Sequence, residues 1–253
     1  MAPYDVLGNI VLAKFARDAT RKEKKQFAHA FLEAHPHVTT VLEKTGRIKG
    51  RLRTPETKWI AGEKTKEALY KENGCVFRFH VDTCYFSPRL ADERKQLAGI
   101  VKKGERVLVL FGGVAPFAIV IAKAGKAREV VSVELNKSAQ RYARENVKRN
   151  KVNVHVVQGD VKKALIALGS FDRIIMTRPN LQETFLRFAL RAARKHTVIH
   201  YYGFCLETEL KSMKEQLLVE ARHAHRTLRI VRTKKAGDIG TRKYRYRIDL
   251  KVC

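Results

Sequence analysis

The sequence has little that would suggest a secreted, metal-binding or membrane protein. It contains only four cysteines in 253 residues, at Cys75, Cys84, Cys205 and Cys253. They form neither a CxxC pair nor a zinc-like spacing, so we expect reduced thiols and no metal site. The apolar runs are far shorter than the roughly 20 residues of a membrane span, and polar residues, not a signal peptide, follow Met1. These absences predict a cytoplasmic protein that does not enter a membrane.

Acidic residues are also scarce. The chain has 25 Asp and Glu against 52 Lys and Arg, which gives a net charge of +27. Such an excess repels itself unless a polyanion neutralises it, so nucleic acid is the expected partner. A solvated basic surface and a membrane-associating patch are the alternatives, but we find no amphipathic basic helix or lipidation signal. Apolar residues make up 45% of the chain, enough for a true core.

The chain is predicted to divide near residue 75. Residues 1–75 contain one helical run at 21–33 and several short strand-like runs, which predicts a small α+β domain. The strand-like runs are residues 6–12, 38–42, 47–52 and 59–61.

Residues 76–253 alternate strands and helices regularly. The strand-like runs are 106–110, 129–134, 152–158, 172–176 and 197–202, and the helix-like runs are 116–124, 137–149, 161–168, 182–195 and 207–222. Asn136 suits the N-cap of the helix at 137–149. This alternation predicts a parallel sheet with right-handed crossovers. Two further β runs, 227–232 and 243–252, follow with no helix between them, so a hairpin closes the sheet. We therefore predict an α/β fold with the Rossmann-like sheet typical of class I methyltransferases.

Three positions of this sheet suit an adenosine cofactor. Gly112 and Gly113 follow the first strand and can form a tight turn, Glu134 ends the second strand and suits the ribose, and Asp160 follows the third and suits the adenine. A glycine turn alone is often only structural. Ala115 and Pro116 make the turn a poor pyrophosphate cradle, whereas S-adenosylmethionine carries no phosphates. S-adenosyl-L-methionine is therefore the predicted cofactor.

Several segments resemble the archaeal–eukaryotic-type tRNA guanine-37 N1-methyltransferases. These are the ten residues Tyr85–Arg94, the turn Phe111–Phe117, the segment His200–Phe204, the opening Tyr4–Ile10 and the element Gly50–Arg53. The resemblance covers essentially the whole chain, and the ten-residue block is specific. It implies methyl transfer to the base 3′ to the anticodon.

The sequence also departs from that family. The family's first domain is expected to be missing. Val109 stands where the family has an aspartate, and Ala115 stands where it has a second glycine. Thr177-Arg178-Pro179 replaces the family's Asn-Leu-Pro, and threonine cannot make the bidentate contact of an amide. These departures bear on efficiency or choice of target base, not on the fold.

The resemblance also assigns roles to residues. Methylation at guanine N1 requires a base for the N1 proton and a donor for the charge that develops on O6. By resemblance Glu93 is that base and Arg53 that donor, and Tyr85, Thr177 and Pro179 line the same pocket. From the residues alone, Glu93 and Arg94 are equally a surface ion pair. The predicted cofactor-binding residues are Phe111, Gly113, Val114, Pro116, Phe117, Glu134, Leu135, Asp160 and Val161.

The predicted RNA surface lies mainly near the C-terminus. Residues 222–247 include ten Lys or Arg and one acid, Asp238. Tyr244 and Tyr246 alternate with Lys243 and Arg245, so cations and tyrosines fall on opposite faces of a strand; the tyrosines are more simply explained as core. The predicted RNA contacts are Arg89, Arg178, Arg242, Lys243 and Arg245, and the partner is the anticodon stem-loop of tRNA. We expect a monomer.

Three functions remain open on the sequence. The first is N1-methylation of guanine 37. The second is another wyosine-pathway transfer to the same nucleotide, a methyl or an aminocarboxypropyl group; the aminocarboxypropyl relatives have Gly-Asn where this chain has Pro88 and Arg89. The third is a non-catalytic tRNA-binding relative, which Val109, Ala115 and Thr177 make conceivable.

Overall fold

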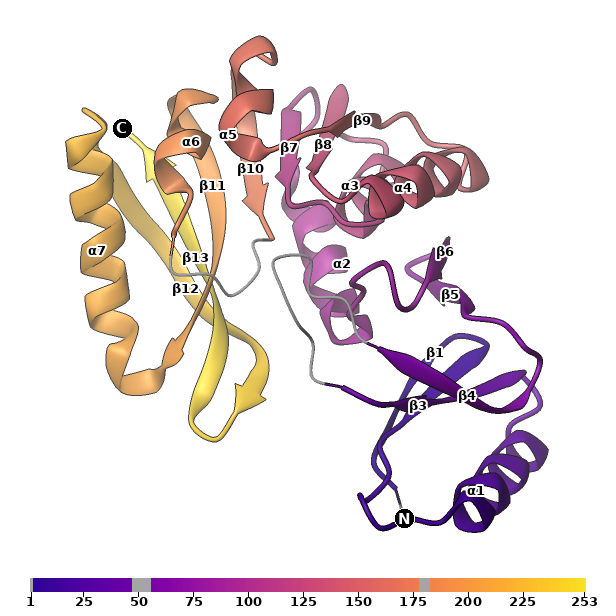
Figure 1. The fold of residues 1–253 in the computed structure, drawn as a ribbon. Coiled ribbons are helices and arrows are strands. Elements are labelled where there is room, and N and C mark those ends of the chain that lie inside the picture. The colour runs from indigo at the N-terminus through magenta and orange to yellow at the C-terminus, as the bar shows by residue number, and fades with distance from the viewer. Residues whose placement is uncertain (1, 47–55, 178–182) are drawn as a thin grey trace.

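The computed structural model describes residues 2–46, 56–177 and 183–253. Its N-terminal part is a four-stranded sheet in the order β1-β2-β3-β4 with one helix, α1 (Arg21–Ala34), packed on it (Figure 1). The four strands are β1 (Tyr4–Leu7), β2 (Ile10–Ala13), β3 (Thr40–Lys44) and β4 (Thr57–Gly62). Thr20 and Glu23 cap the start of α1 reciprocally, each side chain accepting from the other's backbone N–H. The predicted small α+β domain is confirmed.

The single strand expected at residues 6–12 is instead two strands, because the chain turns at Gly8. Gly8 has φ +63°, and a Cβ there would lie 2.0 Å from the carbonyl oxygen of Leu69. Only glycine fits so close an approach in that conformation. The strand expected at 47–52 lies outside the described residues.

A hairpin that the sequence did not predict joins the two parts of the chain. It consists of β5 (Glu67–Glu72) and β6 (Cys75–His80), and the free edge of β6 lies along helix α4 (Lys137–Arg149). The side-chain amide of Asn150 accepts from the N–H of Val76 at 2.7 Å and donates to its carbonyl at 2.7 Å. Asn146 does the same with Arg78, at 2.8 and 3.0 Å.

These two asparagines stand in for a neighbouring strand. They are four residues apart, a rise of about 6 Å along a helix, and the strand residues they pair are two apart, about 6.6 Å along a strand. The two spacings nearly match, so each amide pairs the N–H and C=O of one strand residue.

The large part of the chain is built on a seven-stranded sheet in the order β12-β13-β11-β10-β7-β8-β9. Its strands are β7 (Arg106–Leu110), β8 (Glu129–Glu134), β9 (His155–Gln158), β10 (Phe171–Met176), β11 (Ala193–Leu206), β12 (Leu228–Gly240) and β13 (Lys243–Val252). The first five are parallel to one another, and β13 runs antiparallel between β11 and β12. The predicted parallel sheet with a closing hairpin is confirmed.

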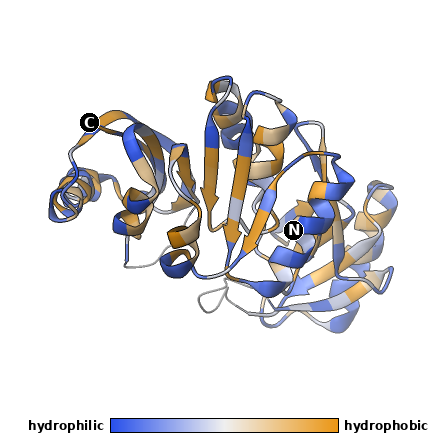
Figure 2. Ribbon diagram, turned by 90° about the horizontal axis from the view of Figure 1, so that it is seen from above, coloured by the Kyte–Doolittle hydropathy of each residue, from blue (hydrophilic) through white to orange (hydrophobic). Residues whose placement is uncertain are grey.

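Helices cover both faces of this sheet (Figure 1). The helices on one face are α2 (Ala91–Ile100), α3 (Pro116–Lys123) and α4; those on the other are α5 (Val161–Ala164), α6 (Leu186–Arg191) and α7 (Leu210–His223). Three 3₁₀ turns, η1 (Pro88–Leu90), η2 (Leu165–Ala167) and η3 (Glu207–Glu209), adjoin α2, α5 and α7. Figure 2 shows apolar residues along the strands and polar residues on the outer sides of the helices. Within the described residues, no helix is both long and apolar enough to cross a bilayer.

Four elements of the large part have the predicted bounds, and several others differ from them. The elements at 106–110, 129–134, 137–149 and 243–252 have the predicted bounds. Asn136 caps α4 as predicted, accepting from the N–H groups of Ser138 and Ala139. The helix expected at 182–195 is shorter, because β11 already begins at Ala193 and pairs with Phe171. Helix α2 was not predicted.

Candidate active site

The turn between β7 and α3 contains three residues in the left-handed region. Phe111, Gly113 and Ala115 have φ of +61°, +57° and +64°. At Gly112 a Cβ would lie 2.1 Å from the Oγ of Ser132, so this glycine is required by a close approach. The turn lies at the carboxyl edge of the sheet, where open α/β sheets bind their ligands.

Glu134 ends β8 directly beside this turn. Its carboxylate accepts from the backbone N–H of Gly113 at 2.7 Å and from that of Asn136 at 2.7 Å. Among the described residues, no lysine or arginine pairs with it. Withdrawal from solvent therefore raises the pKa of Glu134, although the backbone N–H groups oppose this shift. A partly exposed carboxylate with neutral donors and no cation suits the two hydroxyls of a ribose, so the site fits an adenosine cofactor.

The other predicted cofactor residues surround the same edge. Val114, Phe117 and Val161 are buried, and Pro116 is the first residue of α3. Asp160 caps α5 by accepting from the N–H of Lys162 at 2.9 Å. The carbonyl oxygen of Leu135 is 3.5 Å from the side-chain amide of Gln158.

The segment that begins at Tyr85 lies against the glycine turn. The carbonyl oxygen of Tyr85 is 3.6 Å from the position that a Cβ of Gly113 would take. Arg94 holds the segment in place: its guanidinium forms a buried bidentate pair with Glu72 of β5 and donates to the carbonyl of Ser87 at 3.0 Å. A cavity of about 180 Å³ opens beside Tyr85 towards Asp5 of the small domain.

Glu93 is buried, with only 4% of its surface exposed. One carboxylate oxygen accepts from the hydroxyl of Tyr202 at 2.8 Å and from Arg247 at 2.9 Å, and the other pairs with the ammonium group of Lys234. Burial alone would raise the pKa of Glu93, but these partners outweigh it and lower the pKa. The alternative of a surface pair between Glu93 and Arg94 is wrong, because Arg94 pairs with Glu72 and Glu93 with other cations.

The hydroxyl of Thr177 is directed at the strand ends. It lies 3.0 Å from the carbonyl oxygens of both Leu110 and Phe111. This side chain therefore links the end of β10 to the end of β7. The single hydroxyl proton of Thr177 is used in these contacts. Three other predicted site residues, Arg53, Arg178 and Pro179, lie outside the described residues.

The predicted RNA contacts differ in exposure. Arg242 is exposed at the hairpin tip and Lys243 is partly exposed beside it. Arg245, predicted to lie on an open cationic face, is only 8% exposed, with its guanidinium 5.4 Å from the ring centre of Phe204. This correction arises because β13 is an inner strand whose two faces are both covered. Tyr246 is core, as the simpler interpretation had it.

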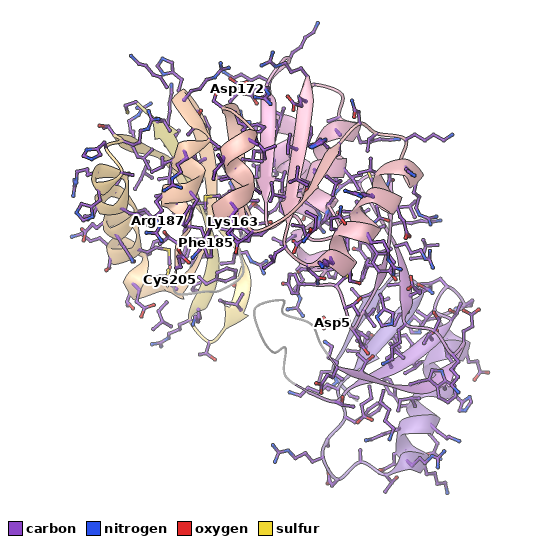
Figure 3. The ribbon with its side chains drawn as sticks, turned by 45° about the horizontal axis from the view of Figure 1, so that its top comes forward. Asp5, Lys163, Asp172, Phe185, Arg187 and Cys205 are labelled. Atoms are coloured by element: carbon purple, nitrogen blue, oxygen red, sulfur yellow. The ribbon has the colours of Figure 1, made fainter. Side chains whose placement is uncertain are left out.

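Arg89 connects the two domains. Its side chain is exposed but pairs with Asp5 at 2.8 Å. Asp5 also pairs with Lys44 at 2.5 Å, and Figure 3 labels it at the side of the small domain that faces the large one. Binding of RNA by Arg89 would therefore compete with a contact between the domains.

Sequence reasoning missed the partners of Glu93. Tyr202 lies in the His200–Phe204 segment and was noted only as part of a motif, while Lys234 and Arg247 were counted only as basic residues. The one available signal was the pair of charged residues Arg247 and Asp249 beside Ile248 and Leu250 in the strand at 243–252. A second cavity, of about 680 Å³, lies apart from all these residues, between α6 and α7 and lined by Arg187 among others (Figure 3).

A family model described as the TRM5/TYW2 methyltransferase domain matches residues 68–231, and one described as the TYW2 N-terminal domain matches residues 2–65. The chain belongs to the TRM5/TYW2 methyltransferase family. Members of this family are enzymes, methyltransferases or related transferases, so the resemblance stated from the sequence is confirmed.

The chain is similar to several named members of the TRM5/TYW2 family. It is 32% identical to the tRNA (guanine(37)-N(1))/4-demethylwyosine(37)-methyltransferase Taw22 of Nanoarchaeum equitans, over 98% of both chains. It is 38% identical to the tRNA (guanine(37)-N(1))-methyltransferase Trm5b of Pyrococcus abyssi, over 79% of this chain and 59% of that protein. The crystal structure of that Trm5b covers 99% of this chain at a TM-score of 0.87 and 34% identity. A complex of aTrm5 with tRNALeu has a TM-score of 0.86 at 25% identity, covering 99% of this chain and 72% of that one.

Proposed function

We propose that this protein transfers the methyl group of S-adenosyl-L-methionine to N1 of guanosine 37, the nucleotide 3′ to the anticodon of tRNA. One observation carries the proposal: Taw22, similar over 98% of both chains, is named for methylation of guanine 37 at N1. The chain spans only 59% of Trm5b, so the similarity to Trm5b supports the reaction less directly.

The cofactor lies at the carboxyl edge of the sheet in this proposal. Glu134 accepts from the ribose hydroxyls, Asp160 lies at the adenine, and the turn from Phe111 to Phe117 encloses the remainder. When bound, S-adenosylmethionine supplies an electrophilic methyl group. The left-handed conformations at Phe111, Gly113 and Ala115 support this placement, because such a turn allows a close approach between backbone and ligand.

The target base enters beside Tyr85 in this proposal. Glu93 takes the N1 proton and Arg53 stabilises the charge on O6, while Thr177, Arg178 and Pro179 shape the loop beneath the base. Arg89, Arg242 and Lys243 contact the RNA backbone of the anticodon stem-loop. Because Arg245 is buried, its role is to support the hairpin.

A second candidate substrate is 4-demethylwyosine at the same position of tRNA. It is favoured by the name of Taw22, which carries both substrates. Aminocarboxypropyl transfer is less well supported, because Pro88 and Arg89 stand where those relatives are expected to have Gly-Asn. A 30% identical relative of that activity nevertheless exists in Methanocaldococcus jannaschii.

The test is to incubate the purified protein with S-adenosylmethionine and tRNA transcripts carrying guanosine or adenosine at position 37. We expect 1-methylguanosine only with guanosine, identified by mass spectrometry of the nucleosides. A third tRNA bearing 4-demethylwyosine tests the second candidate. An aminocarboxypropyl product, or no product with any of these tRNAs, would overturn the proposal.

A further inference from the structure

The carboxylate proposed as the base has no free oxygen. One oxygen of Glu93 accepts from Tyr202 and Arg247, and the other pairs with Lys234. An effective general base needs an accessible lone pair and a pKa near the working pH. In the arrangement seen here Glu93 is buried, donors engage both of its oxygens, and these partners lower its pKa, so the loss of one partner would make it a better base.

Two of the three partners are fixed. Tyr202 is 2% exposed on β11, and Arg247 is 1% exposed on β13. The Nε of Arg247 donates to Asp249 at 3.0 Å, and Asp249 accepts from the Nδ1 of His200 at 2.7 Å. Displacing Arg247 would leave buried carboxylates without this cation, which is strongly unfavourable.

The groups beyond Asp249 in this chain of contacts are also fully paired. Arg173 lies with Nη1 2.7 Å from the Nε2 of His200, and it forms a bidentate pair with Glu105 at 2.7 and 2.9 Å. Because arginine can only donate, Nε2 must accept and the proton of His200 lies on Nδ1, facing Asp249. Burial and the nearby arginines keep the pKa of His200 low, in agreement with a neutral ring. Arg247 is thus held by a row of paired groups.

Lys234 differs from the other two partners. It belongs to β12, one of the two edge strands of the sheet. The pairing of β12 with β13 shifts in register both before and after Lys234. Its side chain is 22% exposed, and its ammonium group also donates to the exposed Gln96 at 2.6 Å. It lies directly opposite Arg247 in the strand pairing, so two like charges share one carboxylate. Lys234 is the partner that can leave.

We propose that Lys234 is an exchangeable counterion of Glu93: a phosphate of the bound tRNA takes the ammonium group and uncovers the oxygen that receives the proton. This inference rests on the proposed function. Lys234 thereby acts as a positioning residue, keeping the carboxylate ionised and covered until RNA is present. Its strand carries further exposed cations, Arg229, Arg232 and Lys235, which bring phosphate close.

The proton balance is simple. The N1–H bond of guanine breaks and its proton passes to Glu93; N1 forms a bond to the methyl carbon as the bond from that carbon to sulfur breaks. The electron pair of that bond stays on sulfur, which becomes neutral. Arg247 remains beside Glu93 and limits how far its basicity rises, while Asp249 and Arg94 are engaged elsewhere, with His200 and Glu72.

The test measures proton uptake when tRNA binds the complex with S-adenosylhomocysteine, by calorimetry at about pH 5.5 in buffers of different ionisation enthalpy. Loss of Lys234 should raise the pKa of Glu93, so the parent should take up protons when tRNA binds. Lys234→Met should abolish this uptake, and so should Glu93→Gln. Lys235→Met is the matched control, since Lys235 is the next residue of the same strand and pairs with Glu207 instead. It should lower tRNA affinity similarly but keep the uptake.

Equal uptake by Lys234→Met and Lys235→Met would overturn the exchange. Binding of S-adenosylhomocysteine by each variant checks that it is folded, and Glu93→Gln tests the same linkage without altering the lysine. Nucleoside analysis of the parent decides the proposed function separately. Methylguanosine with unchanged uptake in Lys234→Met would overturn only the exchange, whereas uptake without methylguanosine would overturn only the function.

Discussion

The two carboxylates of the candidate site, Glu134 and Glu93, are stabilised in opposite ways. Glu134 has backbone N–H groups as partners, and its pKa is raised. Glu93 has two cations and a phenol as partners, and its pKa is lowered. A carboxylate without a counterion remains a good acceptor for neutral hydroxyls. A carboxylate paired with cations is a weaker acceptor, because its oxygens are already engaged. The difference indicates that Glu134 is ready to accept from the neutral hydroxyls of a ribose, whereas Glu93 needs a change in its surroundings before it reacts.

Removal of the carboxylate at the target-base end should have the largest effect. Glu93→Gln should lower single-turnover methylation of tRNA by roughly 10²–10⁴-fold, the usual contribution of a general base. Cofactor and tRNA binding should persist, as measured by calorimetry. Asp92→Asn, an exposed acid one residue earlier on α2, is the control for loss of charge and should methylate normally. Methylation by Glu93→Gln at the parental rate would refute the assignment of the base.

Removal of the fixed cation should affect folding more than chemistry. Arg247→Met leaves Glu93 and Asp249 short of a buried partner, so it should lower the free energy of unfolding by about 3–5 kcal/mol. Urea denaturation measures this, and Arg232→Met on the exposed face of β12 is the control. Adding Glu93→Gln should restore part of the loss; a double variant no more stable than Arg247→Met would mean that Glu93 is not the coupled partner.

At the cofactor end, Glu134→Ala should weaken S-adenosylhomocysteine binding by about 10–100-fold. The expected loss corresponds to about 1.5–3 kcal/mol for a hydrogen bond to a charged group. Calorimetry measures it, and tRNA affinity, tested in parallel, should not change. Unaltered cofactor affinity would remove Glu134 from the ribose site.

Acidification should separate the two carboxylates. A raised pKa means that Glu134 takes up a proton first as the pH falls, while Glu93, with its lowered pKa, stays ionised. Affinity for S-adenosylhomocysteine should therefore fall on mild acidification, before the pairs around Glu93 break. Calorimetry over a pH series should show this fall in the parent and a flat profile in Glu134→Ala. A parallel fall in both proteins would assign the effect to another group.

The smallest effect is expected at the turn that holds Glu134. Ala115 is left-handed, a conformation that costs a residue with a Cβ about 1–2 kcal/mol. Ala115→Gly should therefore stabilise the protein by about 0.5–1 kcal/mol, once the greater freedom of glycine in the unfolded chain is subtracted. Thermal denaturation measures the change. Ala118→Gly, in the regular part of α3, should be destabilising by contrast.

Local patterns predicted the elements at the centre of the large domain. The strands at Arg106–Leu110 and Glu129–Glu134 and the helix α4 have clear periodicities, and Glu134 followed from its place at a strand end. Hairpin β5–β6 was missed because its free edge pairs with Asn146 and Asn150, about 70 residues later. Arg247 lies 154 residues from Glu93, so no local pattern could join them.

The domain division also depends on this hairpin. A boundary at residue 75 would separate β5 from β6, which pair along their length. We propose instead that the division lies between residues 65 and 68, where the two family models meet. No strand was predicted between residues 62 and 105, so no predicted element placed the boundary before the hairpin.

Asn146 and Asn150 have a consequence for self-association. A strand edge such as that of β6 presents free N–H and C=O groups on which another chain can add a strand. Here side-chain amides occupy that edge at Val76 and Arg78, so it cannot recruit a second molecule. Replacement of either asparagine by aspartate would remove the donor from its pair and reopen the edge. The net charge of the protein repels other copies in general but does not block any particular strand edge. The two amides block the edge of β6 directly and so oppose aggregation through that strand.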